Sequence, residues 1–357
     1  MMRPPALEPC VRTTQPELTV LLPGLVAPLR SRQAAGVPRP ETPALAALCA
    51  RSRVDHPPAQ SFEHTALRLA GLPIPEEPPV GAIRRLGLGM PADDAVWMAA
   101  DPVHIHPDLN GAVLFEGPDL QVRDEEAQAL CASFDAYWGE AGLHLEPTRA
   151  GHWHLRLPRE IPVTTTSLRQ VRGHDPFPGM PRDGDRGFWW RLLNETQMLF
   201  HTHPVNRART EAGLPTLNGL WIWGAGSLPP PATEVPAVAS DDPFLQGLAR
   251  LHPAGHFEPV PAQPHAWLSA LAPGAHLLHL DHLARPADYN DPPAWEDGLQ
   301  RLDRDWFQAL EAVLRAGRLR RLRLVDPGGL HLTAAPGRWR GLWRRRDWAG
   351  RLTGARR

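Results

Sequence analysis

The chain has 357 residues, of which 42% are hydrophobic and 22% charged, a composition typical of a globular protein large enough for two lobes. Its formal net charge is −1, so no overall electrostatic field indicates a nucleic-acid-binding protein. No stretch approaches the roughly 18 consecutive apolar residues of a membrane span. The three cysteines have neither metal-ligand nor CxxC spacing, and the N-terminus lacks an apolar signal segment, so we expect a cytoplasmic protein.

The first hundred residues predict alternating strands and helices. Residues 1–16 are rich in proline, and we expect them to be disordered. Residues 17–22 (ELTVLL) are typical of a buried strand that ends at Pro23 and Gly24. A helix is expected over residues 44–50, with Thr42 as its cap, and a second over residues 61–70. Residues 95–100 predict another strand.

The pattern changes between residues 101 and 187. Short strands at residues 111–115 and 152–157 flank a helix predicted over residues 124–141. A linker rich in glycine, proline and aspartate follows at residues 173–187. This segment is therefore predicted to be a smaller α/β lobe inserted into the main one.

Residues 188–229 form the most informative stretch of the chain. A helix beginning near Trp189 is expected to end at Pro204, and a polar turn follows it. Residues 217–223 predict a buried strand that ends in a glycine turn. Further on, a strand is expected over residues 276–280, a long helix capped by Asp291 follows, and the last strand covers residues 320–325.

These elements predict an α/β fold with one mostly parallel central sheet covered by helices on both faces. We expect residues 17–100 and 188–335 to build this core and residues 101–187 to form the inserted domain. Residues 336–357 would be a basic tail rich in arginine and tryptophan. Such a tail suits an anionic surface or partner, whereas the alternative is a solvated terminus, which we favour.

The polar turn is the best candidate for an anion site. His203, Asn206 and Arg209 would bind the anion, Arg207 would lie at its rim and Asn218 would support it. The alternative is a purely structural turn, in which Asn206 bonds the backbone and the arginines are solvated. The sequence alone weighs these two interpretations about equally.

The same stretch carries a family resemblance. The runs NETQMLFHTHPVN and LWIWGAGSLP resemble the hallmark of a bacterial family of regulatory proteins called RpfE-type. More broadly, HPVNRARTEAGLPTLNGLWIWGAGSLP resembles archaeal-type cofactor-independent phosphoglycerate mutases of the alkaline phosphatase superfamily. The resemblance covers most of residues 17–335, and it implies an alkaline-phosphatase-like core and a ligand that is a phosphorylated or carboxylated small molecule.

Active mutases of this type resemble two-metal phosphatases, and the sequence departs from their pattern. The first strand ends in LLPGL where the resemblance implies an aspartate. Ser61 stands near the place of the nucleophile, so it is a weak catalytic candidate. The remaining candidate metal ligands are out of register or interrupted by proline; they are Asp281, His282, Asp288, Asp326 and His331.

Two hypotheses follow from these departures. The first is a catalytically degenerate phosphoglycerate-mutase-like protein without a cofactor, which acts in regulation or ligand binding. The alternative is an active phosphoglycerate mutase or phosphatase that holds Mn or Zn through shifted ligands, to which His203 would also contribute. Under either hypothesis, we expect the end of the first strand, at Pro23 and Gly24, to lie close to Ser61 and Asp326 at one edge of the sheet.

Overall fold

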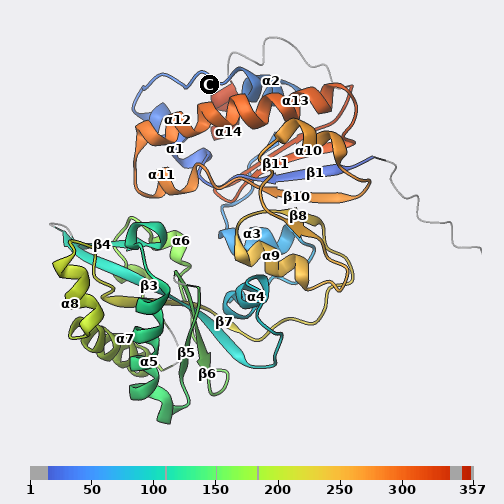
Figure 1. Ribbon diagram of the computed structural model, residues 1–357. Coiled ribbons are helices and arrows are strands. Elements are labelled where there is room, and N and C mark those ends of the chain that lie inside the picture. The colour runs from blue at the N-terminus through green and yellow to red at the C-terminus, as the bar shows by residue number, and fades with distance from the viewer. Residues whose placement is uncertain (1–14, 109–110, 150, 183–184, 338–347, 355–357) are drawn as a thin grey trace, which may run out of the picture.

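A seven-stranded sheet forms the core of the first lobe (Figure 1). The computed structural model describes residues 15–108, 111–149, 151–182, 185–337 and 348–354. The central strand β1 (Glu17–Leu21) pairs in parallel with β10 (Ala275–His279) and with β11 (Arg321–Asp326). The remaining strands are the parallel β8 (Ala237–Ala239) and β9 (Phe257–Glu258) and the antiparallel β12 (Leu330–Ala334) and β2 (Arg53–Asp55). The predicted α/β fold with a mostly parallel central sheet is confirmed.

Helices cover both faces of this sheet because the apolar side chains of β1 point both ways. Leu18 and Val20 belong to one hydrophobic core, whereas Leu21 belongs to the other. The first face is covered by α1 (Val26–Ala34), α2 (Pro43–Arg51), α10 (Pro264–Ala270), α11 (Ala284–Asp288), α12 (Pro292–Leu302), α13 (Gln308–Arg315) and α14 (Trp348–Thr353). The second face is covered by α3 (Phe62–Leu69), α4 (Val80–Gly87) and α9 (Pro243–Arg250).

The second lobe is built on a separate, antiparallel sheet. Its strands are β3 (Val96–Asp108), β4 (Gly111–Glu116), β5 (His144–Arg149), β6 (His152–Leu157) and β7 (Gly219–Gly226). The long strand β3 pairs with β4, β6 and β7 and so connects the sheet. The helices α5 (Asp124–Trp138), α7 (Arg186–His201) and α8 (Pro204–Glu211) pack with it, and the short α6 (Leu168–Val171) lies toward the first lobe.

The pairing of β7 corrects the predicted boundary at residue 187. We expected the chain to return to the central sheet after this point, yet β7 pairs antiparallel with β3 in the second sheet. Trp189, Leu192 and Phe200 of α7 share a hydrophobic core with Ile222 of β7. The second sheet therefore contains residues from both sides of the predicted boundary, because a short apolar strand satisfies either sheet equally well.

Two local predictions also need correction. The polar run after Pro204 is the helix α8 rather than a turn; Pro204 occupies its first position and His203 Nδ1 accepts a hydrogen bond from the Val205 amide. In the tail, residues 338–347 and 355–357 lie outside the described residues. The described part forms α14, whose Trp348 and Leu352 are buried in the first core instead of being solvated.

The expected long helix after Asp291 is present, with one irregular turn. The Asp291 carboxylate accepts a hydrogen bond from the Ala294 amide at 3.0 Å, and α12 begins at Pro292. A π-helical turn over Asp303–Phe307 separates α12 from α13. The Asp303 carboxylate in this turn accepts the amides of Ala44 and Leu45 at the start of α2. None of the helices in the described residues is both long and apolar enough to cross a bilayer.

Candidate functional site

A cleft lies between the two lobes, at the carboxyl ends of β8 and β10. Its volume is about 1070 Å³, and residues from both sheets line it, among them His152, Arg169, Arg172, Asp242, His279 and Asp281. A smaller cavity of about 90 Å³ shares several of these residues and extends toward Arg84 and Trp223. Ligands of open parallel α/β sheets bind outside the carboxyl ends of the strands, so the fold places a candidate site here.

Asp242 is fixed at the end of β8 by local structure. Its Oδ1 accepts hydrogen bonds from the amides of Phe244 and Leu245, which caps α9, and Pro243 occupies the first helical position. The Asp242 amide in turn donates to Ser240 Oγ at 3.0 Å. The second carboxylate oxygen is thereby held toward the cleft.

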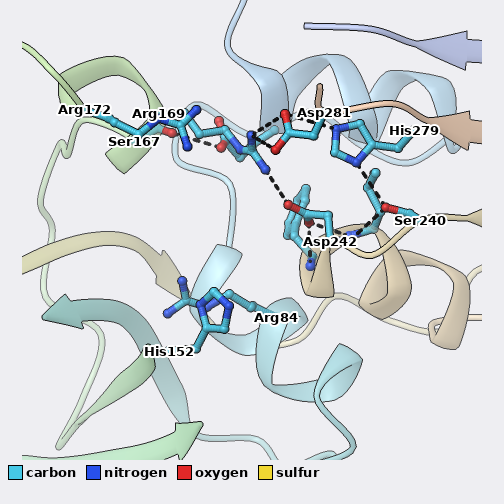
Figure 2. Close-up of polar contacts among 12 residues, drawn as sticks. Arg84, His152, Ser167, Arg169, Arg172, Ser240, Asp242, His279 and Asp281 are labelled. Carbon is cyan, nitrogen blue, oxygen red and sulfur yellow. Dashed lines mark hydrogen bonds and ion pairs between the residues drawn. The ribbon is translucent and has the colours of Figure 1, made fainter. Parts of the chain in front are cut away.

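Arg169 of α6 reaches from the second lobe to this carboxylate. Its Nη2 lies 2.5 Å from Asp242 Oδ2, and its Nη1 lies 3.3 Å from both oxygens of Asp281 (Figure 2). Burial alone would raise the pKa of Asp242, but the Arg169 guanidinium lowers it below its usual value. The nearby carboxylates Asp281, Asp242 and Glu63 outweigh the burial of Arg169 and raise its pKa. Arg169 therefore stays charged and bridges the carboxylates that follow two parallel strands.

His279 is the last residue of β10 and lies deep in the same cluster. Only 2% of its surface is exposed, and its Nδ1 lies 3.1 Å from Ser240 Oγ. Phe62 packs against both this ring and Arg169: the His279 ring centroid is 5.1 Å from that of Phe62, and the guanidinium carbon lies 4.2 Å from the same ring. Burial lowers the pKa of His279. The ring is thus a neutral imidazole at neutral pH.

Arg172 makes a second connection between the lobes. Its Nε and Nη2 donate to Asp288 Oδ2, and its Nη1 donates to Glu116 Oε1 at 3.1 Å. Asp288 follows β10 on α11, so Arg169 of α6 and Arg172, the residue just after this helix, both tie the second lobe to the first. These ion pairs close one side of the cleft.

A buried polar cluster supports the opposite side of the cleft. Arg84 of α4 pairs with Asp101 of β3 at 2.8 Å, donates to the Trp153 carbonyl oxygen and bonds His154 Nε2 at 3.0 Å. His152 lies on this side, with its Nδ1 3.9 Å from Asp101 Oδ1. Figure 2 places Arg84 and His152 across from Asp242.

Several of the predicted metal ligands contact protein atoms and lie on separate elements. Asp326 is buried and accepts the amides of Leu25, Val26 and Gly328, while Asp288 is held by Arg172. His331 lies on the antiparallel strand β12, in register with Asp55. Among the described residues, no group of three or more histidines, cysteines or acidic residues has a geometry that would hold a metal ion. The shifted-ligand alternative, in which Asp281 and His282 join these residues and His203, stays a prediction that metal analysis of the protein would test.

The expected convergence of strand ends is present. The Asp326 carboxylate binds the backbone just after Gly24, and the Gln60 amide donates to the Pro327 carbonyl oxygen at 2.9 Å, which brings Ser61 to the same edge. Ser61 caps α3, and its Oγ lies 2.7 Å from His64 Nδ1. It lines a separate cavity of about 60 Å³ rather than contacting Arg169. Its position gives the weak catalytic candidate a structural function as a helix cap.

The predicted anion site is occupied by the fold itself. Asn206 donates to the carbonyl oxygens of Phe200 and Leu217 and accepts the Leu217 amide. Arg209, 1% exposed, donates to the carbonyl oxygens of Pro215 and Leu120 and pairs with Glu126 at 2.7 Å. Because these groups bond to protein atoms, they are not available to a ligand.

The three remaining members of that candidate site are consistent with this correction. Asn218 exchanges hydrogen bonds with the backbone of Ile105, and His203 caps α8. Arg207 is exposed on α8. The structural alternative holds for Asn206, which bonds the backbone, but not for Arg209, which is buried in an ion pair instead of being solvated.

Sequence reasoning missed Arg169, Arg172 and Asp242. The run Ser240–Asp241–Asp242–Pro243 does carry a signal, since an aspartate followed by proline after a short apolar run is typical of a helix start that follows a strand. No comparable signal marks the two arginines, because their partners Asp242 and Asp288 lie 73 and 116 residues away.

The fold and this cleft define a two-lobed α/β protein whose ligand site would lie between the lobes. Comparison with known proteins indicates which members of this class the chain resembles. The chain is 27% identical over 111 residues to 2,3-bisphosphoglycerate-independent phosphoglycerate mutase of Methanosarcina barkeri, which covers 30% of this chain and 28% of that protein. It is 22% identical over 129 residues to the probable enzyme of the same name from Geobacter sulfurreducens, 36% of this chain and 32% of that protein. These matches thus span about a third or less of the relatives' own lengths.

One solved structure supports the fold over a larger share of the chain. The PH0037 protein from Pyrococcus horikoshii superimposes with a TM-score of 0.53 at 16% identity, covering 93% of this chain and 90% of that one. The cofactor-independent phosphoglycerate mutase from Thermoplasma acidophilum gives a TM-score of 0.45 at 18% identity, with 91% of each chain covered. No protein-family model matches the sequence. The sequence matches show that the chain is similar to 2,3-bisphosphoglycerate-independent, that is cofactor-independent, phosphoglycerate mutases.

Proposed function

We propose that this protein is a phosphoglycerate-mutase-like protein that has lost metal-dependent catalysis and acts by binding a small ligand in the cleft between its lobes. The observation that carries the proposal is the contact of Arg169 with Asp242 and Asp281. A two-metal phosphatase needs unpaired carboxylates at the strand ends to hold its metals. Here a guanidinium already neutralises these carboxylates.

Metal binding would have to displace Arg169 from Asp242. That displacement would leave the partly buried guanidinium of Arg169 without its closest partner, which is unfavourable. Two other acidic candidates also bind protein atoms: Asp326 accepts hydrogen bonds from three backbone amides, and Asp288 pairs with Arg172. The resemblance to the RpfE-type family of regulatory proteins supports a regulatory function for such a binding protein.

Metal analysis tests this proposal directly. The purified protein is incubated with Mn²⁺ or Zn²⁺ and desalted, and its metal content is measured together with the interconversion of 2- and 3-phosphoglycerate. We expect well under one ion per chain and no interconversion. The double variant Asp242→Asn/Asp281→Asn serves as the control for adventitious binding to surface histidines. About two ions per chain in the wild type, lost in this variant, would overturn the proposal.

A further inference from the structure

The two carboxylates bound to Arg169 are held very differently. Asp242 Oδ2 lies 2.5 Å from Nη2, and the Asp242 side chain, 14% exposed, is anchored by the amides of α9. Asp281 is 3.3 Å from Nη1, and its side chain is 42% exposed. An exposed ion pair of this kind contributes little to stability. Asp281 is therefore the carboxylate that can leave Arg169.

His279 presents a buried donor beside the same carboxylate. The Asp281 carboxylate, 3.7 Å from His279 Nε2, favours the tautomer with its proton on Nε2, in which Ser240 Oγ accepts the Asp242 amide and donates its own proton to His279 Nδ1. This Nε2 is buried and has no hydrogen-bond partner among the described residues. The nearest carboxylate oxygen, Asp281 Oδ1, is 3.7 Å away, too far for a hydrogen bond. A buried N–H without a partner is unfavourable, so this position suits an acceptor atom.

We propose that Arg169 and His279 form a binding site for the oxyanion group of a small ligand, a carboxylate or a phosphate, and that Asp281 acts as an internal competitor for this site. The inference rests on the proposed function, because it identifies the ligand chemistry of the same cleft. Phe62 packs against both donor groups and holds them on one side of the cleft. An oxygen placed between Nη1 of Arg169 and Nε2 of His279 satisfies both donors.

The charges around Arg169 favour an anion that replaces Asp281 over an anion that binds in addition to it. Glu63, Asp242 and Asp281 already surround Arg169, so another anion would be repelled if all three carboxylates stayed in place. When the exposed Asp281 swings out, an incoming oxyanion replaces its charge and the local balance is unchanged. The cleft of about 1070 Å³ is large enough for the rest of a small molecule.

Calorimetric titration of the chelator-treated protein with inorganic phosphate, and separately with acetate, tests this inference. Asp281→Asn removes the competitor, whereas Asp305→Asn removes an equal charge from an exposed residue that lines the same cleft. We expect Asp281→Asn to bind one of the two anions up to about fivefold more tightly than Asp305→Asn does, which corresponds to the strength of an exposed ion pair. The anion that gains more identifies the ligand group. Equal affinities of the two variants for both anions, or no binding by either, would overturn the inference.

A spectroscopic measurement locates the bound anion. With ¹⁵N-labelled histidine, the Nε2 resonance of His279 is expected to shift on addition of the anion in Asp281→Asn, and that of His265, an exposed cleft residue, serves as the reference. Tighter binding without a shift at His279 would contradict the assignment of this donor. Metal content decides the proposed function independently, so failure of one proposal can be told from failure of the other.

Discussion

Individual residues of the HPVN run show how a correct choice of residue types can lead to a wrong site. Arginine, asparagine and histidine do bind anions, but Arg209 meets Glu126, which lies 83 residues earlier in the chain. The resulting pair is buried, with side-chain exposures of 0% for Arg209 and 5% for Glu126. Burial alone would raise the pKa of Glu126, but bonds from Arg123 and the charge of Arg209 lower it instead.

Replacing Arg209 therefore tests stability rather than binding. Arg209→Met leaves the Glu126 carboxylate with only the exposed Arg123 as a cationic partner and removes the donors to two carbonyl oxygens, which we expect to lower the free energy of unfolding by about 3–5 kcal/mol. Arg207→Met, in the same helix but exposed, is the matched control and should change it by less than about 0.5 kcal/mol. Chemical denaturation measures both. If Arg209→Met unfolds like the wild type yet loses affinity for inorganic phosphate, the original anion-site hypothesis regains its support.

The sequence reveals residue types and local patterns, whereas a polar side chain's function depends on its partner. Ser61 illustrates the part that local pattern does predict, since its position before an amphipathic helix indicates the cap that the structure has. Arg169 illustrates the other part. Its function depends on Asp242 and Asp281, and no spacing rule connects them because the contact forms only after two lobes pack together.

At the scale of elements, helix positions were largely predictable but their stabilising contacts were not. The helix near residue 44 is present as α2, and Thr42 is at its N-cap. However, the buried Thr42 hydroxyl has no hydrogen-bond partner in the described part of the chain, and the amides of Ala44 and Leu45 donate instead to Asp303. A carboxylate from another helix therefore caps α2.

This arrangement predicts opposite results for two substitutions at one helix end. Asp303→Ala removes two hydrogen bonds from the start of α2 and should lower the free energy of unfolding by about 1–2 kcal/mol. Thr42→Val removes an unsatisfied buried hydroxyl while keeping the shape, so stability should be unchanged or slightly higher. Thermal and denaturant unfolding provide the comparison. A larger loss for Thr42→Val than for Asp303→Ala would contradict this capping scheme.

At the scale of the whole molecule, the sheet to which each strand belongs was the least predictable property. Strand β7 is apolar and ends in a glycine turn, which suits either a buried parallel strand or the middle of an antiparallel sheet. The choice is made by long-range pairing: Ala100 of β3 lies opposite Ile222, and Trp223 Nε1 donates to Asp101 at 2.9 Å. Neither contact can be predicted from a short segment of the sequence, because its two residues lie far apart in the chain.

The corrected lobe boundary predicts which fragment folds by itself. Residues 79–227 contain all five strands of the second sheet, the helix α7 and the helix α4. Arg84 of α4 pairs with the buried Asp101, so its inclusion avoids an uncompensated buried charge. We expect this fragment to unfold cooperatively in urea and to retain the near-ultraviolet signal of its packed tryptophans.

Residues 101–187, the domain expected from sequence, provide the matched comparison. This fragment lacks β7 and most of α7, so β3 loses a neighbouring strand and the core loses Trp189, Leu192 and Phe200. It also lacks the part of β3 that pairs with β6, since that pairing covers residues 96–99. Without these contacts the remaining apolar surface cannot offset the conformational entropy of the chain. Cooperative unfolding of the 101–187 fragment would contradict this prediction, as would non-cooperative unfolding of the 79–227 fragment. Either result would show that strand pairing in the second sheet does not define the unit that folds by itself.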